Sequence, residues 1–277
     1  MANHMNRIFF FEGLHGSGKS TLAKKVAEKL RNTYPNLQIV MRSEKPCPLD
    51  ICRLSVFSEK ELLVFLRMVV ELRHELKPEI ESELMRFSSF ENNHYYVNWF
   101  EFLMSYHLWD SNLVSYALAH ELCDGKAGYE LYREVTFNRW KNFAKRISSD
   151  TAYLFEGVLL QHPITELLGY YEENDADIVR FINDLLETIS GIPTELVYIS
   201  TDRVEDLLSK TARVRNEQGY RWIGGLIKLT TTCNYGRTHN LMGFDGAVQF
   251  CKKRICIERK ILDQITINKN IIFRNFD

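Results

Sequence analysis

The sequence predicts an α/β protein with three layers, α/β/α, built on a five-stranded and mostly parallel sheet. Five short apolar segments have the length of strands, and helical patterns lie between the first four of them. Strands that alternate with helices in this way are typical of βαβ units, whose strands run parallel. A stretch with three glycines joins the first strand to the first helix. The segment between the second and third strands is long and has helical patterns, so it predicts a large helical insertion at that place.

The expected strands share a short apolar core with polar flanks, and they are Ile8 to Glu12, Gln38 to Met41, Ala152 to Phe155, Glu195 to Ile199 and Asn270 to Phe273. The clearest helix follows the glycine stretch. Its residues Leu22, Val26 and Leu30 recur every four positions, which is the spacing of one helix face. The lysines of this segment are then expected to face outward.

A long segment without the strand pattern separates the second strand from the third. It spans residues 58 to 147 and contains "EKELLVFLRMVVELRHEL" and "NWFEFLMSYHLWDSNLVSYALAHEL". Both stretches have apolar stripes at helical spacing, so each predicts a long helix, and no strand is expected between them. Because neither a repeat nor a low-complexity linker divides the chain, residues 1 to 277 are predicted to form one domain with a helical subdomain.

Composition and charge exclude several classes of protein. The chain of 277 residues has 45% hydrophobic residues and a formal net charge of −1, so it lacks the general basic field that gathers extended nucleic acid. We expect neither a secretory signal nor a membrane span. The six cysteines form no CxxC pair, which favours free thiols in a reducing cytoplasm over a zinc site.

The glycine stretch matches the pattern G-x-x-x-x-G-K-[ST], with a strand before it and a helix after it. Glycines let backbone amides turn inward around a phosphate, and the positive end of the next helix adds to their field. The lysine supplies a mobile charge for the β- and γ-phosphates, and the serine supplies a hydroxyl for Mg²⁺. The expected nucleotide-binding residues are therefore Gly13, Leu14, His15, Gly16, Ser17, Gly18, Lys19, Ser20 and Thr21.

Motifs of other nucleotide-binding classes do not occur in the sequence. No Asp stands three residues before a Gly, and "NKNI" at 268 to 271 lacks the Asp of a guanine-binding motif. The third strand ends in "AYLFEG", with one acid rather than the Asp-Glu pair of motor and transporter ATPases. The sequence also lacks the serine-glycine-glycine segment of transporter ATPases. Because motifs of GTPases and of motor or transporter ATPases are absent, the sequence favours a kinase that acts on a small molecule.

The opening "FFFEGLHGSGKST" resembles the first motif of the thymidylate kinase and deoxynucleoside kinase families of P-loop kinases. Three shorter segments, "VMRSEKP", "LFEG" and "STDRVEDLLSKTARVRNEQGYRW", are similar to their later motifs. The sequence departs from the pattern where Lys45 is inserted and where Gly157 replaces an arginine. The resemblance covers the α/β core and implies a P-loop fold.

The resemblance also implies roles for residues outside the loop. Glu44 corresponds to the acid that takes the proton of the attacking hydroxyl, with a solvated loop acid as the alternative. Glu156 corresponds to an acid that joins Ser20 in holding Mg²⁺, with a structural salt bridge or helix cap as the alternative. Residues 203 to 225 resemble a lid, in which Arg213 and Arg215 would stabilise the transferring phosphoryl group; a solvated helix face is the alternative.

The function expected from these features is transfer of the γ-phosphate from Mg²⁺-ATP to a small acceptor, by resemblance a nucleoside or nucleotide. A sugar, an antibiotic or a cofactor precursor remains open as the acceptor. The alternative from another class is an NTPase or regulatory protein whose helical region binds a partner. The aromatic residues of that region, among them Tyr95, Trp99 and Trp109, are expected to be mainly core. The sequence leaves the oligomeric state open, with a homodimer among the options.

Overall fold

The computed structural model describes residues 7–41, 47–49, 51–74, 79–91, 93–148 and 150–274. The chain divides into two compact units, and each is described by itself below. The core unit comprises Met1–Asp50 and Phe137–Asp277, and the insert unit comprises Ile51–Thr136. No helix in the described ranges combines the length and the apolar character needed to cross a bilayer.

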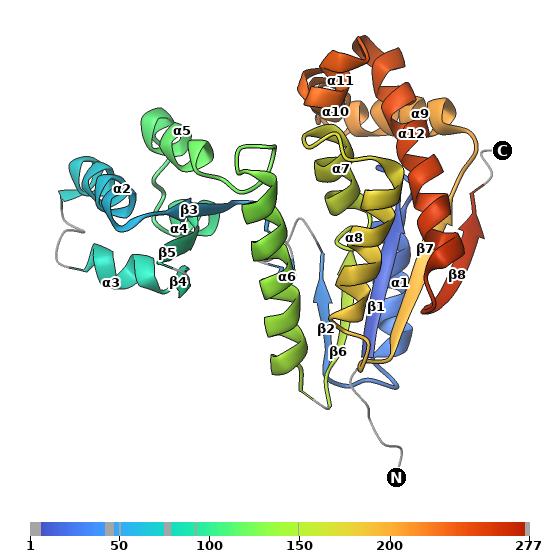
Figure 1. Cartoon of the computed structure of the whole chain (residues 1–277), viewed down its shortest axis with the longest axis horizontal. Helices are drawn as coiled ribbons and strands as arrows, with labels where there is room; N and C mark the ends of the chain where they lie inside the picture. Colours follow the sequence, from blue (N-terminus) through green and yellow to red (C-terminus); the bar gives the residue numbers. More distant parts are fainter. Residues whose placement is uncertain are drawn as a thin grey trace. The chain divides into compact units, whose positions relative to one another are not determined.

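The core unit is built on a five-stranded sheet in the order β2-β6-β1-β7-β8 (Figure 1). Its strands are β1 (Arg7–Gly13), β2 (Leu37–Val40), β6 (Ala152–Glu156), β7 (Thr194–Ser200) and β8 (Asn268–Phe273). Each pair of neighbours is parallel. The structure therefore confirms the five predicted strands within two residues at their ends, and the sheet is wholly rather than mostly parallel.

Helices cover both faces of this sheet. On one face, Phe9 and Phe11 of β1 share a core cluster with Ala23 of helix α1 (Lys19–Leu30). On the other face, the ring of Phe10 stacks on Trp140 of α6 (Tyr129–Arg146). Successive side chains of a strand point to opposite faces, so the run "FFF" supplies apolar contacts to both layers. The remaining helices of this unit are α7 (Gln161–Gly169), α8 (Asp175–Glu187), α9 (Val204–Glu217), α10 (Trp222–Thr232), α11 (Asn234–Thr238) and α12 (Gly243–Gln264).

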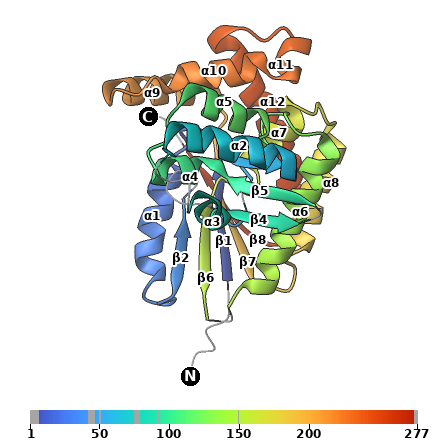
Figure 2. The ribbon, with the colours of Figure 1, turned by 90° about the vertical axis from the view of Figure 1, so that its left-hand side faces the viewer.

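The insert unit contains strands, so the prediction of a purely helical insertion was wrong. The strands β3 (Leu54–Phe57), β4 (Ser88–Glu91) and β5 (His94–Asn98) form an antiparallel sheet in the order β3-β5-β4 (Figure 2). Each has only four or five residues, too few for periodicity to distinguish them from helix. Asn93 has a φ of +61° in the turn between β4 and β5, a conformation that asparagine adopts more readily than most residues.

The second long helix predicted in this region is interrupted. The segment forms α4 (Trp99–Ser105) and α5 (Ser111–Ala119), which follow α2 (Glu59–Leu72) and α3 (Ile80–Met85). His107 lies between α4 and α5 with a φ of +54°, which no right-handed helix accommodates. Asp110 then begins α5 by accepting hydrogen bonds from the amides of Asn112 (2.8 Å) and Leu113 (3.0 Å).

Aromatic side chains form the centre of the insert unit. Phe57, Phe65 and Phe102 are fully buried there, and Trp99 belongs to the same cluster. The prediction that the aromatics are mainly core is therefore confirmed for these residues. Trp109 is the exception, since it is 50% exposed.

Replacing Asp110 tests the cap that begins α5. We expect Asp110→Ala to lower the free energy of unfolding by about 1 kcal/mol, because two amides at the helix start lose their acceptor. Asp110→Asn keeps an acceptor oxygen and is the matched control, expected to retain most of the stability. Urea denaturation measures both. An equal loss in the two variants would show that the charge of Asp110 matters and its capping bonds do not.

Candidate active site at the glycine loop

The glycine loop, residues 13 to 18, joins the carboxyl end of β1 to helix α1. Gly13, Gly16 and Gly18 have φ values of +137°, +79° and +93°, a region that side chains disfavour. The loop closes on itself where the amide of Ser17 donates to the carbonyl of Leu14 at 3.1 Å. Helix α1 has no capping side chain and no acidic residue in its first turn. Its positive end therefore lacks a local negative partner.

Two of these glycines let neighbouring elements come close to the loop. A Cβ atom on Gly13 would lie 2.5 Å from the carbonyl oxygen of Ile199, at the end of β7. A Cβ atom on Gly16 would lie 2.1 Å from the hydroxyl oxygen of Thr211, on α9. The glycines are thus required by packing from outside the loop, as well as by the loop's own conformation.

Lys19 is the buried cation of the site. Its side chain is 4% exposed, and its Nζ donates to the carbonyls of Gly13 (3.1 Å) and Leu14 (2.8 Å). Nζ also lies 4.0 Å from Oε1 of Glu156. Burial lowers the pKa of Lys19 to about 8, while the nearby carboxylate of Glu156 opposes that shift. The contact with Lys19 is of the salt-bridge kind that the sequence analysis kept as the alternative role for Glu156.

Glu156 reaches this position because β6 pairs with β1 in parallel register, with Glu156 opposite Phe11. The carboxyl ends of the two strands therefore meet at the same edge of the sheet, where ligands bind in open α/β folds. Ser20 and Thr21 follow Lys19 in the first turn of α1, and both are exposed. The two residues predicted to hold Mg²⁺ thus lie next to Lys19, one in space and one in sequence.

Glu12 is a site residue to which the sequence analysis gave no role beyond its place in the opening "FFFEGLHGSGKST". Its fully buried carboxylate accepts hydrogen bonds from the amides of Leu159 (2.7 Å) and Gln161 (3.1 Å), where α7 begins. Burial raises the pKa of Glu12 to about 7, although Lys19 and the amides act in the opposite direction. An acid at the end of the otherwise apolar run "IFFF" was the signal that could have found it.

His15 connects the loop to the turn that follows Glu156. Its Nε2 lies 3.0 Å from Nε2 of Gln161, and since an amide nitrogen only donates, the histidine nitrogen accepts. The Oε1 atom of Gln161 and the hydroxyl of Ser17 are buried and have no hydrogen-bond partner among the described residues. Buried polar atoms are normally satisfied, so these two indicate capacity to bind a polar ligand at the loop.

Two arginines from the C-terminal part of the chain hold the loop's carbonyls, and the sequence analysis missed both. Arg254 of α12 donates to the carbonyl of Gly13 at 3.2 Å, and Arg274, which follows β8, donates to that of Gly16 at 2.8 Å. They are 241 and 258 residues from their partners, so no local pattern could have indicated them. The site accordingly combines the uncapped start of α1 with three nearby cations, an arrangement suited to a polyanion.

The two arginines of the predicted lid lie in a helix. Arg213 and Arg215 are both within α9, and both are exposed. Thr211 is the α9 residue that reaches the glycine loop. Helix geometry places Arg215 roughly 40° around the axis from Thr211 and Arg213 roughly 200° around it. Arg215 thus shares the face that adjoins the loop, and Arg213 lies on the opposite face.

Glu44, the predicted proton acceptor, lies outside the described residues. Its role stays a prediction.

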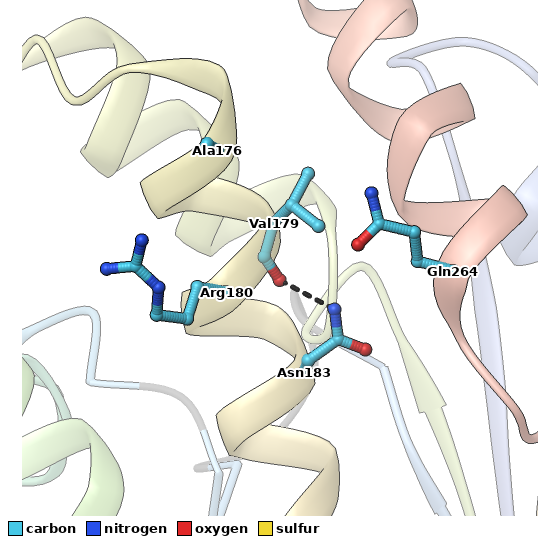
Figure 3. Close-up of a pocket in the computed structure, with 5 residues that line it drawn as sticks. All are labelled: Ala176, Val179, Arg180, Asn183 and Gln264. Carbon is cyan, nitrogen blue, oxygen red and sulfur yellow. Dashed lines mark hydrogen bonds between the residues drawn. The ribbon is translucent and has the colours of Figure 1, made fainter.

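A surface depression lies between α8 and α12, lined by Ala176, Val179, Arg180, Asn183 and Gln264 (Figure 3). The amide of Asn183 donates to the carbonyl of Val179 at 3.0 Å, and Arg180 pairs with Asp177 at 2.8 Å. The side chains of Arg180 and Asn183 are thus already engaged within α8, and no residue of the glycine loop lines the depression. The glycine loop is the stronger candidate site.

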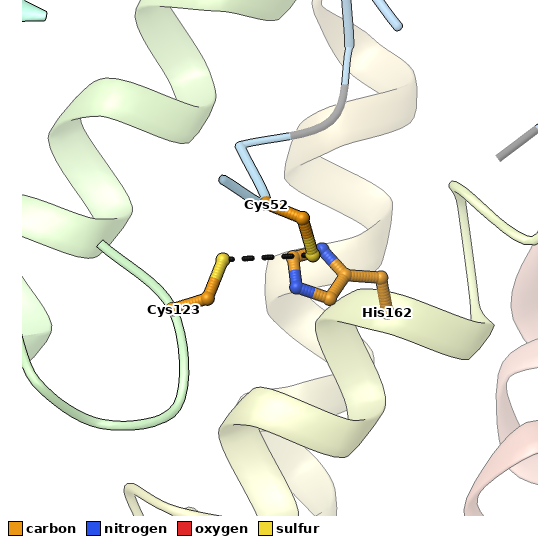
Figure 4. A group of neighbouring side chains, drawn as sticks. All are labelled: Cys52, Cys123 and His162. Atoms are coloured by element: carbon orange, nitrogen blue, oxygen red, sulfur yellow. Dashed lines mark hydrogen bonds between the residues drawn. The ribbon is translucent and has the colours of Figure 1, made fainter. Parts of the chain in front are cut away.

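The cysteines of the insert unit include a close pair. The Sγ atoms of Cys52 and Cys123 are 3.7 Å apart, and both residues are thiols rather than a disulfide (Figure 4). The two cysteines are 71 residues apart in the chain, so the sequence spacing did not indicate this pair.

Substitution of Glu12 tests its raised pKa. A carboxyl with a pKa of about 7 in the folded state and 4.5 as its ordinary value keeps a proton that the unfolded chain loses. Stability therefore falls as pH rises through that interval. Between about pH 5 and about pH 7.5, the free energy of unfolding should fall by about 2 kcal/mol more in the wild type than in Glu12→Gln.

The window ends below the pKa of Lys19, about 8, so Lys19 keeps most of its charge throughout the comparison. Glu195→Gln, which changes a partly exposed acid on β7, is the control and should keep the wild-type slope. Chemical denaturation at each pH measures all three proteins. Equal slopes in the wild type and Glu12→Gln would contradict the raised pKa.

No protein-family model matches the chain, and no curated protein matches it either. The geometry of the chain's own residues is therefore the basis for a functional conclusion.

Proposed function

We propose that the protein is a P-loop phosphotransferase that moves the γ-phosphate of ATP to a small-molecule acceptor. The observation that carries the proposal is the place of Lys19, buried in a glycine loop at the start of α1 and 4.0 Å from Glu156. The two residues follow adjacent parallel strands, at the edge of the sheet where α/β proteins bind ligands. A cation and an acid held together at such an edge are the groups needed to handle a phosphate and its metal ion.

The residues of the loop fit a triphosphate. The amides at the start of α1 have no side-chain cap, and the buried hydroxyl of Ser17 has no hydrogen-bond partner among the described residues. Within the described ranges, Lys19 binds backbone carbonyls and one carboxylate at 4.0 Å, which are groups that it can exchange for phosphate oxygens. These features support a polyanion as the ligand of the loop.

The residues also fit Mg²⁺. The hydroxyl of Ser20 and the carboxylate of Glu156 are hard oxygen ligands, which this ion prefers, and they would hold it beside Lys19. When bound, the ion would neutralise negative charge on the β- and γ-phosphates.

The proposed reaction is an in-line displacement. A hydroxyl or phosphate oxygen of the acceptor forms a bond to the γ-phosphorus, the bond to the β–γ bridging oxygen breaks, and ADP leaves. Lys19 stabilises the charge that develops, and Arg215 is placed on the face of α9 that adjoins the loop. For a hydroxyl acceptor, the proton goes to a carboxylate, for which Glu44 is the candidate. A nucleoside or nucleotide acceptor follows from the family resemblance, and a cytoplasmic location remains part of the same prediction.

A second candidate function is an NTP-binding regulator whose insert unit contacts a partner. Large apolar side chains of this unit favour it, since Phe90, Met104 and Trp109 are 58%, 48% and 50% exposed. Exposed apolar groups of this kind mark interaction surfaces when they gather into a patch. The two functions differ in whether a small acceptor receives phosphate.

Replacing Lys19 tests the loop. We expect Lys19→Ala to lower phosphate transfer from γ-labelled ATP by on the order of a hundredfold or more, because the charge that meets the phosphates is lost. Lys25→Ala removes an exposed lysine of the same helix and should leave turnover unchanged. The measurement is label transfer across a panel of nucleosides, nucleotides and other metabolites.

Full ATP affinity and turnover in Lys19→Ala would overturn the loop assignment. Slow ATP hydrolysis without any phosphorylated acceptor would instead favour the regulatory function.

Substitution of Glu156 tests the metal site separately. We expect Glu156→Gln to raise the Mg²⁺ concentration needed for half-maximal turnover by on the order of tenfold, because an anionic oxygen ligand becomes neutral. Titration of activity with Mg²⁺ at saturating ATP measures it, and an unchanged half-maximal concentration would leave Glu156 with a structural role. Glu195→Gln again serves as the control.

A further inference from the structure

We propose that Arg254 is a positioning residue for the glycine loop, which keeps the Gly13 carbonyl satisfied when Lys19 leaves it for the triphosphate. This inference rests on the proposed function, because it assumes that Lys19 moves to a phosphate. It adds a role for α12, an element near the C-terminus to which neither the motif nor the proposed reaction assigns one.

Two cations share one acceptor at the base of the loop. Lys19 Nζ lies 3.1 Å from the carbonyl oxygen of Gly13, and a terminal nitrogen of Arg254 lies 3.2 Å from the same oxygen. A carbonyl oxygen has two lone pairs, so it accepts from both donors at once. Lys19 has a second acceptor in the carbonyl of Leu14, at 2.8 Å. Among the described residues, the Gly13 carbonyl is therefore the one acceptor to which both Lys19 and Arg254 donate.

Arg254 cannot follow Lys19 away from the carbonyl, because a buried network holds it. Its Nε donates to Oε1 of Glu258 at 2.7 Å, and its terminal nitrogen lies 2.6 Å from the same carboxylate oxygen. The other oxygen of Glu258 accepts from the hydroxyl of Tyr198 at 2.5 Å. The arginine and glutamate side chains are 1% and 0% exposed. Burial by itself would lower the pKa of Arg254, but Glu258 raises it, so the guanidinium stays charged.

The Gly13 carbonyl is also fixed. Gly13 ends β1, is buried, and lies in register with Ile199 of β7, whose carbonyl oxygen would be 2.5 Å from any Cβ at this position. A fixed, buried carbonyl that lost both donors would be an unsatisfied acceptor, and that cost would weaken nucleotide binding. With Arg254 in place, Lys19 exchanges the carbonyl for a phosphate oxygen without leaving the carbonyl unpaired.

The test is the affinity for Mg²⁺-ATP of Arg254→Met/Glu258→Gln. This pair of changes removes both charges together, so that neither is left buried without its partner. We expect the dissociation constant for Mg²⁺-ATP at about pH 7 to rise on the order of tenfold. Turnover at saturating ATP should stay near the wild-type value because Lys19 and Glu156 are unchanged, and general loosening of the fold would not produce this split between affinity and turnover. Lys252→Met, an exposed change on the same helix, is the control and should match the wild type.

Arg254→Lys provides a second measurement that does not depend on the double variant folding. It keeps the charge, but one ammonium cannot reproduce the guanidinium's joint contacts with Glu258 and Gly13. Its affinity for Mg²⁺-ATP should therefore fall. Wild-type affinity in either folded variant would overturn the proposal for Arg254 and leave the proposed function standing. Failure of the wild type itself to bind Mg²⁺-ATP would instead reject the proposed function.

Discussion

The arrangement of the core unit depends on three ionisable side chains gathered at one edge of its sheet, two of them buried. Lys19 interacts electrostatically with Glu12, which ends the apolar run of β1, and with Glu156, which ends β6. Charges out of water are costly unless they are paired and hydrogen-bonded, so these groups restrict where α1, α7 and the glycine loop can lie. Glu12 binds the amides at the start of α7, and Lys19 binds the carbonyls of its own loop.

This burial explains why the site is prepared for an anion. The shifted pKa values of Glu12 and Lys19, about 7 and about 8, both measure the cost of keeping these side chains charged without water. Functional sites often retain such groups because the chemistry needs them there. A bound polyanion that attracted Lys19 would offset part of this desolvation cost. A loop with a purely structural role would be more stable with apolar side chains at these positions. The loop's second set of contacts, from Arg254, lies on its carbonyl side and leaves the amides available.

Local sequence patterns predicted those elements that are long enough to show a hydrophobic period. Strand β1 and helix α1 were predictable because their apolar residues recur along their length. The insert unit was harder, since four-residue strands such as β3 carry too little pattern to be separated from helix. The break at His107 was hidden as well, because the apolar stripe continues on both sides of it.

The sequence by itself determined the parallel sheet and the glycine loop, and it placed an acid, Glu156, at the end of the third strand. These follow from local periodicity and from a motif whose residues are consecutive, so short-range chemistry specifies them. Only the tertiary structure placed Arg254 and Arg274 on the loop's carbonyls, joined His15 to Gln161, and put Thr211 rather than Arg213 against Gly16. Those contacts join segments far apart in the chain, and their partners are decided by how helices and strands pack, which no local pattern records.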